Sequence, residues 1–270
     1  MIDFNSVNFS YDTLSILSDI SFSVSKGEFI SLIGENGAGK STLLKLFNGL
    51  NRPSSGTVHI CGLNTLSAKT SELASHVGFL FQNPDRQICC TTVREELNFG
   101  INTDPARTEL ILKTFGFLPD ASPFSQSRGQ RQQTALASVI ARNTDILVLD
   151  EPTTGLYYRE CTKMMTYIQK LNREEGKTII MVSHDMEIVQ DFSDRILVLA
   201  GGKLIADGPA HTILSDKPLL AQASLLPPQI ADIALQLGSS FSNICTVQEM
   251  ADRVRELVPA VTVQTQDVRL

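Results

Sequence analysis

The sequence predicts an α/β domain whose core is a parallel sheet covered by helices. Apolar runs of strand length recur at 29–33, 146–149 and 178–182, and polar residues scarcely interrupt them. Strands of this composition are buried on both faces, as in parallel sheets. Segments with helical periodicity lie between these runs, and a glycine-rich segment at 34–41 joins the first run to a helix. This alternation of strands and helices indicates a layered α/β domain.

The two ends of the domain differ from its centre. Near the start of the chain, apolar and polar residues alternate over 2–9 and again over 16–24. This pattern predicts half-buried antiparallel strands. Near the other end, apolar runs at 196–199 and 204–206 flank the turn residues 201–203, which predicts a β-hairpin.

Three helices are predicted from their periodicity and stop signals. Two of them cover 132–142 and 159–175, and Gly176 ends the second. The other covers 41–50 and has an apolar face formed by Leu43, Leu44, Leu46, Phe47 and Leu50.

Two adjacent prolines at 227–228 divide the chain into two parts. We therefore expect a main domain over 1–226 and a C-terminal extension over 227–270. Apolar residues at helical spacing predict a small helical unit in the extension, namely Ile244, Val247, Ala251 and Val254.

The overall composition excludes several classes of protein. Of the 270 residues, 42% are hydrophobic and 19% are charged, which excludes wholesale disorder. A formal net charge of −6 argues against a dedicated nucleic-acid-binding protein, so no nucleic-acid partner is expected. The sequence has no apolar run of about 18 residues and no signal-peptide pattern, so we expect it neither to span a membrane nor to be secreted.

The five cysteines indicate neither a disulfide framework nor a Cys-only zinc site, because their number is odd and no CxxC pair occurs. We interpret them as small core or surface residues. This interpretation fits the adjacent Cys89 and Cys90 least well.

The glycine-rich segment at 34–41 fits the pattern G-x-x-x-x-G-K-[ST] between a strand and a helix. Its glycines allow the backbone to curl with N–H groups around phosphate oxygens, at a helix N-terminus that favours anions. Lys40 would reach the β- and γ-phosphates of ATP, and the Ser41 hydroxyl would bind Mg²⁺. The predicted nucleotide-binding residues of this phosphate loop are Gly34, Glu35, Asn36, Gly37, Ala38, Gly39, Lys40, Ser41 and Thr42.

Two further strands end in polar residues that suit ATP hydrolysis. The run 146–149 leads into Asp150, placed to hold Mg²⁺, and Glu151, placed to accept a proton from an attacking water. His184 follows the run 178–182, whose strand would lie beside that of Asp150. Glu151 and His184 are therefore the predicted catalytic residues, with His184 near the γ-phosphate.

The order of four motifs resembles that of an ABC-transporter ATPase over about residues 2–226. The sequence Ser-Arg-Gly-Gln-Arg-Gln-Gln at 127–133 precedes the Asp150 strand, between the phosphate loop and the Ser-His-Asp sequence at 183–185. The resemblance implies a P-loop NTPase core with a parallel sheet. It also implies an N-terminal antiparallel β subdomain, a helical signature subdomain and a small C-terminal helical extension.

The resemblance also implies further site residues. Gln82 would touch Mg²⁺ and the attacking water, and Tyr11 would stack on adenine. In a head-to-tail dimer, Ser127, Gly129 and Gln130 would contact the γ-phosphate of the ATP bound by the partner subunit. The implied Mg²⁺ ligands are Ser41, Gln82 and Asp150.

A narrower resemblance is to the ATPases of energy-coupling factor (ECF) transporters, which import vitamins and transition-metal ions. It rests on Phe-Gln-Asn-Pro-Asp-Arg-Gln at 81–87, on the serine-rich segment 122–130 and on the tail segments 226–230 and 246–249. It implies an ATP-hydrolysing subunit, peripheral on the cytoplasmic face of the cell membrane. Its partners would be a second ABC ATPase subunit, unlike or identical, and a polytopic membrane subunit, with the tail joining the two ATPases.

Two positions depart from the family pattern. Gln126 stands where the signature segment usually begins with leucine, and Tyr157 stands where an aspartate usually crosses the dimer interface. Tyrosine has no carboxylate, so the resemblance implies a weakened or asymmetric second ATP site. Glu151 and His184 of this chain would remain competent for hydrolysis. The ATPase dimer could consist of two unlike subunits or of two copies of this chain.

The segment 82–100 would dock a membrane partner, and Ile88, Val93 and Leu97 would either supply apolar contacts or belong to the core. A soluble ABC-type ATPase acting on nucleic acid or ribosomes is disfavoured, because no heptad run and only one phosphate loop occur. An ABC exporter subunit is a further alternative, and the sequence does not specify the cargo.

Overall fold

The main sheet of the protein has six strands. The computed structural model describes residues 1–100, 104–241, 244 and 246–257. The strand order is β10-β9-β3-β8-β7-β6, and all neighbours are parallel except the antiparallel pair β9 and β10. The strands are β3 Phe29–Ile33, β6 Val77–Leu80, β7 Ile146–Asp150, β8 Thr178–Val182, β9 Arg195–Ala200 and β10 Lys203–Pro209. The predicted parallel core and the later hairpin are thus confirmed.

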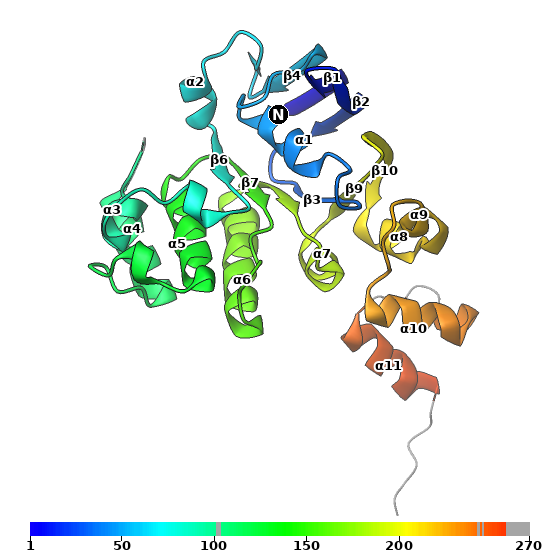
Figure 1. Cartoon of the computed structure of the whole chain (residues 1–270). Coiled ribbons are helices and arrows are strands. Elements are labelled where there is room, and N and C mark those ends of the chain that lie inside the picture. The colour runs from blue at the N-terminus through cyan, green and yellow to red at the C-terminus, as the bar shows by residue number, and fades with distance from the viewer. Residues whose placement is uncertain (101–103, 242–243, 245, 258–270) are drawn as a thin grey trace, which may run out of the picture.

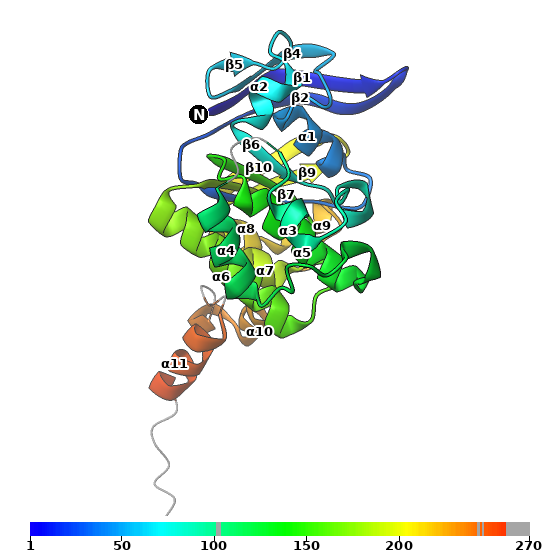
Figure 2. The same ribbon diagram turned by 90° about the vertical axis from the view of Figure 1, so that its left-hand side faces the viewer.

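A second, antiparallel sheet lies at the opposite end of the molecule from α11 (Figures 1 and 2). Its order is β2-β1-β4-β5. The strands are β1 Ile2–Tyr11, β2 Leu14–Val24, β4 Ser55–Ile60 and β5 Leu63–Asn64. The alternating pattern at the start of the chain therefore predicted β1 and β2 correctly, whereas β4 and β5 were not predicted.

Helices surround the main sheet and continue beyond it (Figure 1). They are α1 Lys40–Phe47, α2 Thr70–Ala74, α3 Val93–Leu97, α4 Pro105–Phe115, α5 Arg128–Ala141, α6 Tyr158–Glu175, α7 Met186–Phe192, α8 Ala210–Ser215, α9 Lys217–Gln222, α10 Gln229–Leu237 and α11 Val247–Leu257. Short 3₁₀ turns cover Pro84–Arg86, Pro123–Ser125 and Ser239–Phe241. Among the described residues, no helix combines the length and the apolar character needed to cross a bilayer.

The two faces of the main sheet bury different partners. Leu32, Val148 and Ile180 point to one face and pack with α1 and the antiparallel sheet. Leu147 and Met181 point to the other face and pack with α3, α4, α5 and α6. Because both faces are covered, the central strands need apolar side chains at nearly every position.

Two predicted helices have different bounds in the structure. The chain turns at Gly49, which has a φ of +68°, so α1 ends at Phe47. The prediction that Leu50 lies on its buried face was wrong, because Leu50 is 49% exposed. Helix α5 begins at Arg128 rather than at 132, because Ser127 and Gln130 form a capping box at its start.

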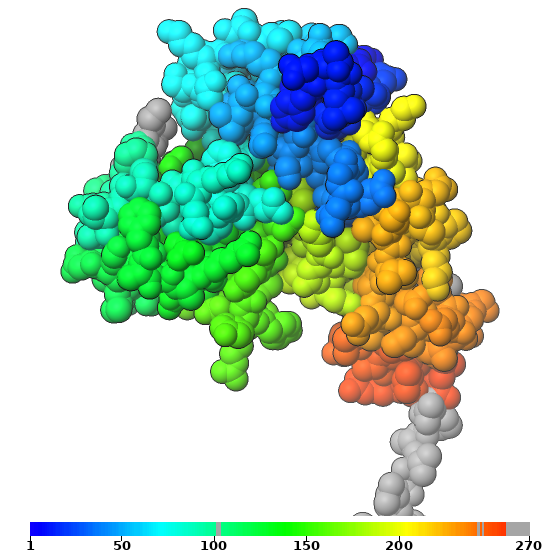
Figure 3. Space-filling view, viewed as in Figure 1, coloured from blue at the N-terminus to red at the C-terminus, as the bar shows by residue number. Residues whose placement is uncertain are grey.

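The helices α10 and α11 form the helical unit predicted in the C-terminal extension. Figure 3 shows them in orange and red at one end of the molecule. Val247, Ala251 and Val254 lie on α11, whereas Ile244 lies before it, so the apolar stripe is shorter than predicted. Cys245 lies outside the described residues.

Candidate active site

The phosphate loop runs from the end of β3 into α1 and requires glycine at two positions. A Cβ on Gly34, whose φ is +154°, would lie 2.1 Å from the carbonyl oxygen of Leu199 on β9. A Cβ on Gly39, whose φ is +100°, would lie 2.8 Å from Cδ2 of Leu17 on β2. The loop backbone therefore passes close to both neighbours, in a curl that side chains at these positions would prevent.

Lys40 is folded into this loop. Its Nζ donates hydrogen bonds to the carbonyl oxygens of Gly34 at 2.6 Å and Glu35 at 2.7 Å, and the residue is 7% exposed. Burial lowers the pKa of Lys40, while the carboxylates of Glu151 and Asp150 act in the opposite direction. The ammonium group therefore stands at the mouth of the loop, where anionic oxygens would be its natural partners.

Asp150 ends β7 and lies beside the first turn of α1. Its side chain accepts a hydrogen bond from Ser41, and burial is the main cause that raises the pKa of its carboxyl group. Its Oδ1 is buried and has no hydrogen-bond partner within the described structure. A cavity of about 210 Å³ is lined by Ser41, Gln82 and Asp150, among others. An unpartnered carboxylate oxygen beside a hydroxyl and an amide oxygen fits the oxygen ligands that Mg²⁺ prefers.

Replacement of Asp150 by asparagine is expected to stabilise the nucleotide-free protein by about 1 kcal/mol, because it removes an incompletely paired buried charge. The raised pKa of Asp150 means that protonation favours the folded state. The wild-type chain should therefore gain stability as the pH falls from neutral towards that pKa, and Asp150→Asn should lack this gain. Thermal unfolding in chelator at several pH values measures both effects. The control is Asp145→Asn, because Asp145 is exposed and lies just before the same strand. A melting temperature below that of the wild type for Asp150→Asn at neutral pH would contradict the prediction.

Glu151 adopts a left-handed backbone conformation with a φ of +54°. This turn directs its carboxylate towards two of the predicted site residues. Its Oε1 lies 2.8 Å from His184 Nε2 and accepts a hydrogen bond from Gln82 Nε2 at 3.0 Å. Its Oε2 accepts a hydrogen bond from the Thr154 hydroxyl at 3.0 Å. The carboxylate is therefore held from three sides.

One cavity of about 310 Å³ brings most of the predicted residues together. It extends from the phosphate loop to the ends of β6, β7 and β8. It is lined by Ile16, Asn36, Gly37, Gly39, Lys40, Ser41, Thr42, Gln82, Glu151 and His184. The parallel pairing of β7 with β8 confirms that the strand before His184 lies beside the strand of Asp150. It brings Glu151 and His184 to the same edge of the sheet.

Several predicted residues do not line this cavity. Ala38 is buried in the core, and the Glu35 carboxylate accepts a hydrogen bond from Ser224. Tyr11 is 44% exposed, packs edge-on against Phe9 at 4.8 Å, and accepts a hydrogen bond from Asn51. Its ring is therefore held at the surface of the antiparallel sheet.

The signature residues form the start of α5 and lie outside the cavity. The Ser127 hydroxyl accepts a hydrogen bond from the Gln130 N–H, and the Gln130 side chain accepts one from the Ser127 N–H. A Cβ on Gly129 would lie 2.5 Å from the carbonyl oxygen of Gly155. The segment is thus a capped helix N-terminus packed against the loop that follows Glu151.

Three residues near the site were missed by the sequence analysis. Gln132 Nε2 donates a hydrogen bond to the Glu151 carbonyl at 3.2 Å, and Thr154 holds the carboxylate. Ile16 on β2 lines the cavity. Thr154 lies three residues after Glu151, so a local signal existed for it. Gln132 and Ile16 come from distant segments, and no local pattern indicated them.

The two positions that depart from the expected family pattern, Gln126 and Tyr157, have distinct surroundings. Gln126 binds back onto α5, where its Oε1 accepts a hydrogen bond from Thr134 and its carbonyl accepts one from Arg131. These polar contacts anchor the helix start where an apolar residue was expected. Tyr157 is 82% exposed, and so is its neighbour Tyr158.

Three apolar residues of the segment 82–100, for which two interpretations were open, belong to the core. Ile88 is 6% exposed, and Val93 and Leu97 are fully buried in the cluster formed with α5 and α6. Of the two interpretations left open for them, the core interpretation holds. A partner that docks on this segment would meet its other side chains.

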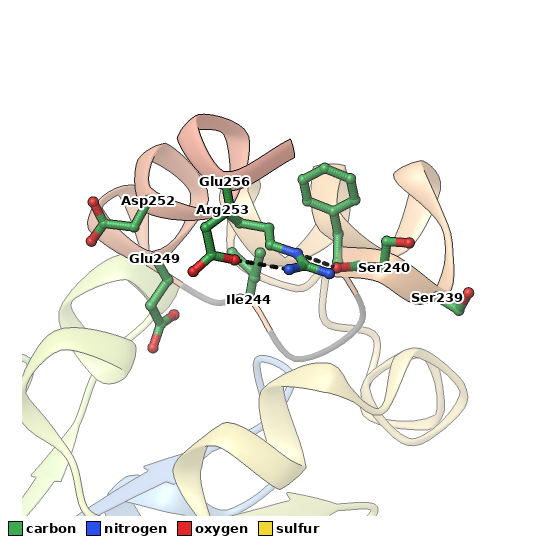
Figure 4. A pocket seen from close by; sticks show the side chains of 8 residues that line it. Ser239, Ser240, Ile244, Glu249, Asp252, Arg253 and Glu256 are labelled. Atoms are coloured by element: carbon green, nitrogen blue, oxygen red, sulfur yellow. Dashed lines mark hydrogen bonds and ion pairs between the residues drawn. The ribbon is translucent and has the colours of Figure 1, made fainter. Parts of the chain in front are cut away.

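Two of the cavities that involve the C-terminal helices are larger than the cavity at the phosphate loop. One of about 500 Å³ lies between α11 and the turn Ser239–Phe241, where Arg253 donates hydrogen bonds to the Ser240 carbonyl and to Glu256 (Figure 4). The other, of about 710 Å³, lies between α6, α7 and the start of α11, where Figure 3 shows the surface hollowed. Neither contains a residue of the predicted site.

Sequence comparisons identify similar proteins. A profile of the family described as ABC transporter matches residues 17–154. The energy-coupling factor transporter ATP-binding protein EcfA1 of Caldanaerobacter subterraneus is 38% identical over 88% of this chain and 90% of that protein. A putative ABC transporter ATP-binding protein of the same organism is 37% identical over 84% of this chain and 42% of its own length. The chain spans about two fifths of the length of the first such relatives.

Solved structures show the same fold. The structure of cbiO1 from Clostridium perfringens, part of the ABC transporter complex cbiONQ, has a TM-score of 0.72 at 29% identity. The match covers 86% of this chain and 97% of that one. A dimeric ATP-binding cassette in a post-hydrolysis state, bound to ADP and Pi, has a TM-score of 0.71 at 28% identity, over 78% of this chain and 99% of that one.

Proposed function

The chain belongs to the ABC transporter family of ATP-binding cassettes, and we propose that it hydrolyses ATP to energise transport through a membrane complex. The observation that carries this proposal is the meeting of Lys40, Gln82, Glu151 and His184 around one cavity, with Asp150 beside it. This combination provides a cation for phosphate, a base for water and oxygen ligands for Mg²⁺.

The phosphates of ATP would bind in the curl of the phosphate loop. In the free protein, Lys40 donates hydrogen bonds to two loop carbonyls. When ATP binds, Lys40 would give up these bonds and donate to the β- and γ-phosphates instead. Ser41, Gln82 and Asp150 would hold Mg²⁺, which supplies charge neutralisation for the phosphates when bound. The buried oxygen of Asp150 supports this assignment.

Glu151 would accept the proton of the attacking water, because its carboxylate opens into the cavity opposite the loop. Gln82, which donates a hydrogen bond to that carboxylate, would orient the same water. His184 would stabilise the charge that develops on the γ-phosphate. Its 2.8 Å contact with Glu151 keeps both side chains at one end of the cavity.

The signature residues would act in a second subunit. Ser127, Gly129 and Gln130 lie at an exposed helix N-terminus, which suits contact with the γ-phosphate held by a partner cassette. Tyr11 would stack on adenine from its exposed position at the edge of the antiparallel sheet. ATP would then close the dimer, and hydrolysis would reopen it.

Replacement of Tyr157 by aspartate is expected to raise ATP hydrolysis by the assembled dimer several-fold. The side chain at 157 lies next to the start of α6 and faces solvent, so an aspartate there would be free to contact a partner subunit. A steady-state hydrolysis assay of the assembled ATPase pair measures the effect. Tyr158→Asp, at the equally exposed neighbouring position, is the matched control. Equal hydrolysis rates for the wild type and Tyr157→Asp would refute the proposal that Tyr157 weakens ATP hydrolysis.

We further propose that the membrane complex is an importer of the ECF type, for a vitamin or a transition-metal ion. The similarity to EcfA1 and to cbiO1 supports this class. The chain would lie peripherally on the cytoplasmic face of the membrane, with a second ABC ATPase subunit and a polytopic membrane subunit as partners. The unit over 227–270 would help join the two ATPases, because Ile233 and Leu237 on α10 and Val247 on α11 are exposed apolar residues.

Affinity purification from gently solubilised membranes tests this proposal. The expected result is recovery of a second, unlike ATPase and a polytopic membrane subunit, identified by mass spectrometry. Recovery of this chain with itself and a membrane subunit would support a homodimeric transporter instead. Recovery of ribosomes or nucleic-acid-binding proteins without a membrane subunit would refute the transport function.

A further inference from the structure

Two thiols and one carboxylate gather outside the nucleotide cavity, in the segment between the turn Pro84–Arg86 and α3. The ligand atoms of Cys89, Cys90 and Glu96 all lie within 4.8 Å of one another. The two sulfur atoms are 4.0 Å apart. Cys89 is exposed, Cys90 is half-buried and Glu96 is fully buried, so the cluster runs from the surface into the core.

The carboxylate of Glu96 is only half satisfied. Its Oε2 accepts hydrogen bonds from the backbone N–H groups of Cys89 and Cys90, both at 2.9 Å. Its Oε1 is buried and has no hydrogen-bond partner within the described structure. A buried acceptor without a partner costs about 1–3 kcal/mol, and a cation at this point would offset that cost.

We propose that Cys89, Cys90 and Glu96 form a binding site for a divalent transition-metal cation that accepts sulfur ligands, such as Zn²⁺. Sulfur ligands select such ions over Mg²⁺ and Ca²⁺, which prefer oxygen. Tetrahedral coordination with Zn–S bonds of about 2.3 Å places two sulfurs about 3.8 Å apart, close to the distance observed between Cys89 and Cys90. The fourth ligand would be a water molecule, because Cys89 is exposed and the cluster is therefore open to solvent on that side.

Binding would be a proton-for-metal exchange with no change of oxidation state. Each thiol would lose its proton to solvent and form a metal–sulfur bond, and the Glu96 carboxylate would supply an oxygen ligand.

The neighbouring carboxylate of Glu95 differs from that of Glu96 and provides a matched control. Glu95 Oε2 accepts hydrogen bonds from the Thr91 hydroxyl at 2.7 Å and the Thr92 N–H at 3.1 Å, and it caps the start of α3. It is thus engaged in local capping.

A bound cation at Cys89, Cys90 and Glu96 would join the segment that follows Gln82 to α3.

Titration of the reduced, chelator-treated full-length chain with Co²⁺ tests the proposal. The expected result is one equivalent of bound Co²⁺ with near-ultraviolet thiolate-to-cobalt charge-transfer absorbance, which Zn²⁺ then displaces. Co²⁺ held by Asp150 and Ser41 would give no such band, because those ligands are oxygens. Cys89→Ser, Cys90→Ser and Glu96→Gln should each weaken binding at least about tenfold, the loss typical of removing even an outer partner of a metal site.

Glu96→Gln keeps an oxygen that accepts the two backbone hydrogen bonds, so the segment should remain folded. Thermal unfolding of each variant checks this. Glu95→Gln and Cys61→Ser should bind Co²⁺ as the wild-type chain does. Absence of the charge-transfer band in the wild-type chain, or its persistence in folded Cys89→Ser and Glu96→Gln, would overturn the proposal. So would a Cys89–Cys90 disulfide that forms equally fast with and without Zn²⁺.

Discussion

Replacement of Glu151 by glutamine is expected to lower the rate of ATP hydrolysis about 10²- to 10⁴-fold, the range typical of losing a general base. Glutamine has nearly the same shape. Its one oxygen can accept the hydrogen bond from Gln82, and its NH₂ group can donate to the Thr154 hydroxyl. It does not accept a proton from water at neutral pH. ATP binding should therefore persist, and the ATP-bound dimer should accumulate.

Single-turnover hydrolysis and equilibrium ATP binding separate the two effects. Glu160→Gln is the control, because Glu160 lies in the first turn of α6, where it accepts a hydrogen bond from the Tyr157 N–H, and it does not line the nucleotide cavity of the described structure. Loss of ATP binding in Glu151→Gln, in proportion to the loss of hydrolysis, would show that Glu151 has a structural role. Unchanged hydrolysis would assign the base to another residue.

Replacement of Lys40 by alanine is expected to weaken ATP binding by about 10²-fold or more. Each hydrogen bond between a charged donor and a phosphate oxygen contributes about 1.5–3 kcal/mol, and Lys40 would make at least two. The variant should also be less stable without nucleotide. The loop carbonyls of Gly34 and Glu35 would lose their buried donor.

Titration with a fluorescent ATP analogue measures the affinity, and thermal unfolding measures the stability. Lys26→Ala, a lysine that lies before β3 and outside the cavity, should change neither quantity appreciably. Lys40→Arg should restore the charge but not the affinity, because the planar guanidinium does not fit the contacts of a compact ammonium. Wild-type affinity in Lys40→Ala would contradict the placement of the phosphates in this loop.

Much of the fold followed from local patterns. The strands β3 and β8 have the predicted bounds, because buried parallel strands need unbroken apolar runs. The helix bounds were predicted less well, since Gly49 and the capping pair Ser127 and Gln130 set them. The strand β6 and the short helices α2 and α3 were not predicted, because such short segments carry little periodicity.

For the candidate site too, local patterns predicted some features and not others. Lys40 and Ser41 were predictable, because a glycine-rich loop between a strand and a helix constrains residue types at fixed spacing. The orientation of Glu151 was not, since its left-handed φ of +54° follows from no local pattern. Its contact with Gln82 joins residues 69 positions apart, so it exists only once β6 and β7 pair.

By itself the sequence determined a phosphate loop on a parallel sheet, followed along the chain by carboxylates and a histidine. These features are local, and the chemistry of phosphate binding restricts them to a few residue types. Only the tertiary structure decided that Ile88, Val93 and Leu97 are core and that Tyr157 faces solvent. It alone showed that Glu96, beside two thiols, has a buried oxygen with no hydrogen-bond partner among the described residues. Burial and unpaired groups depend on segments that meet only on folding, so no pattern within one segment records them.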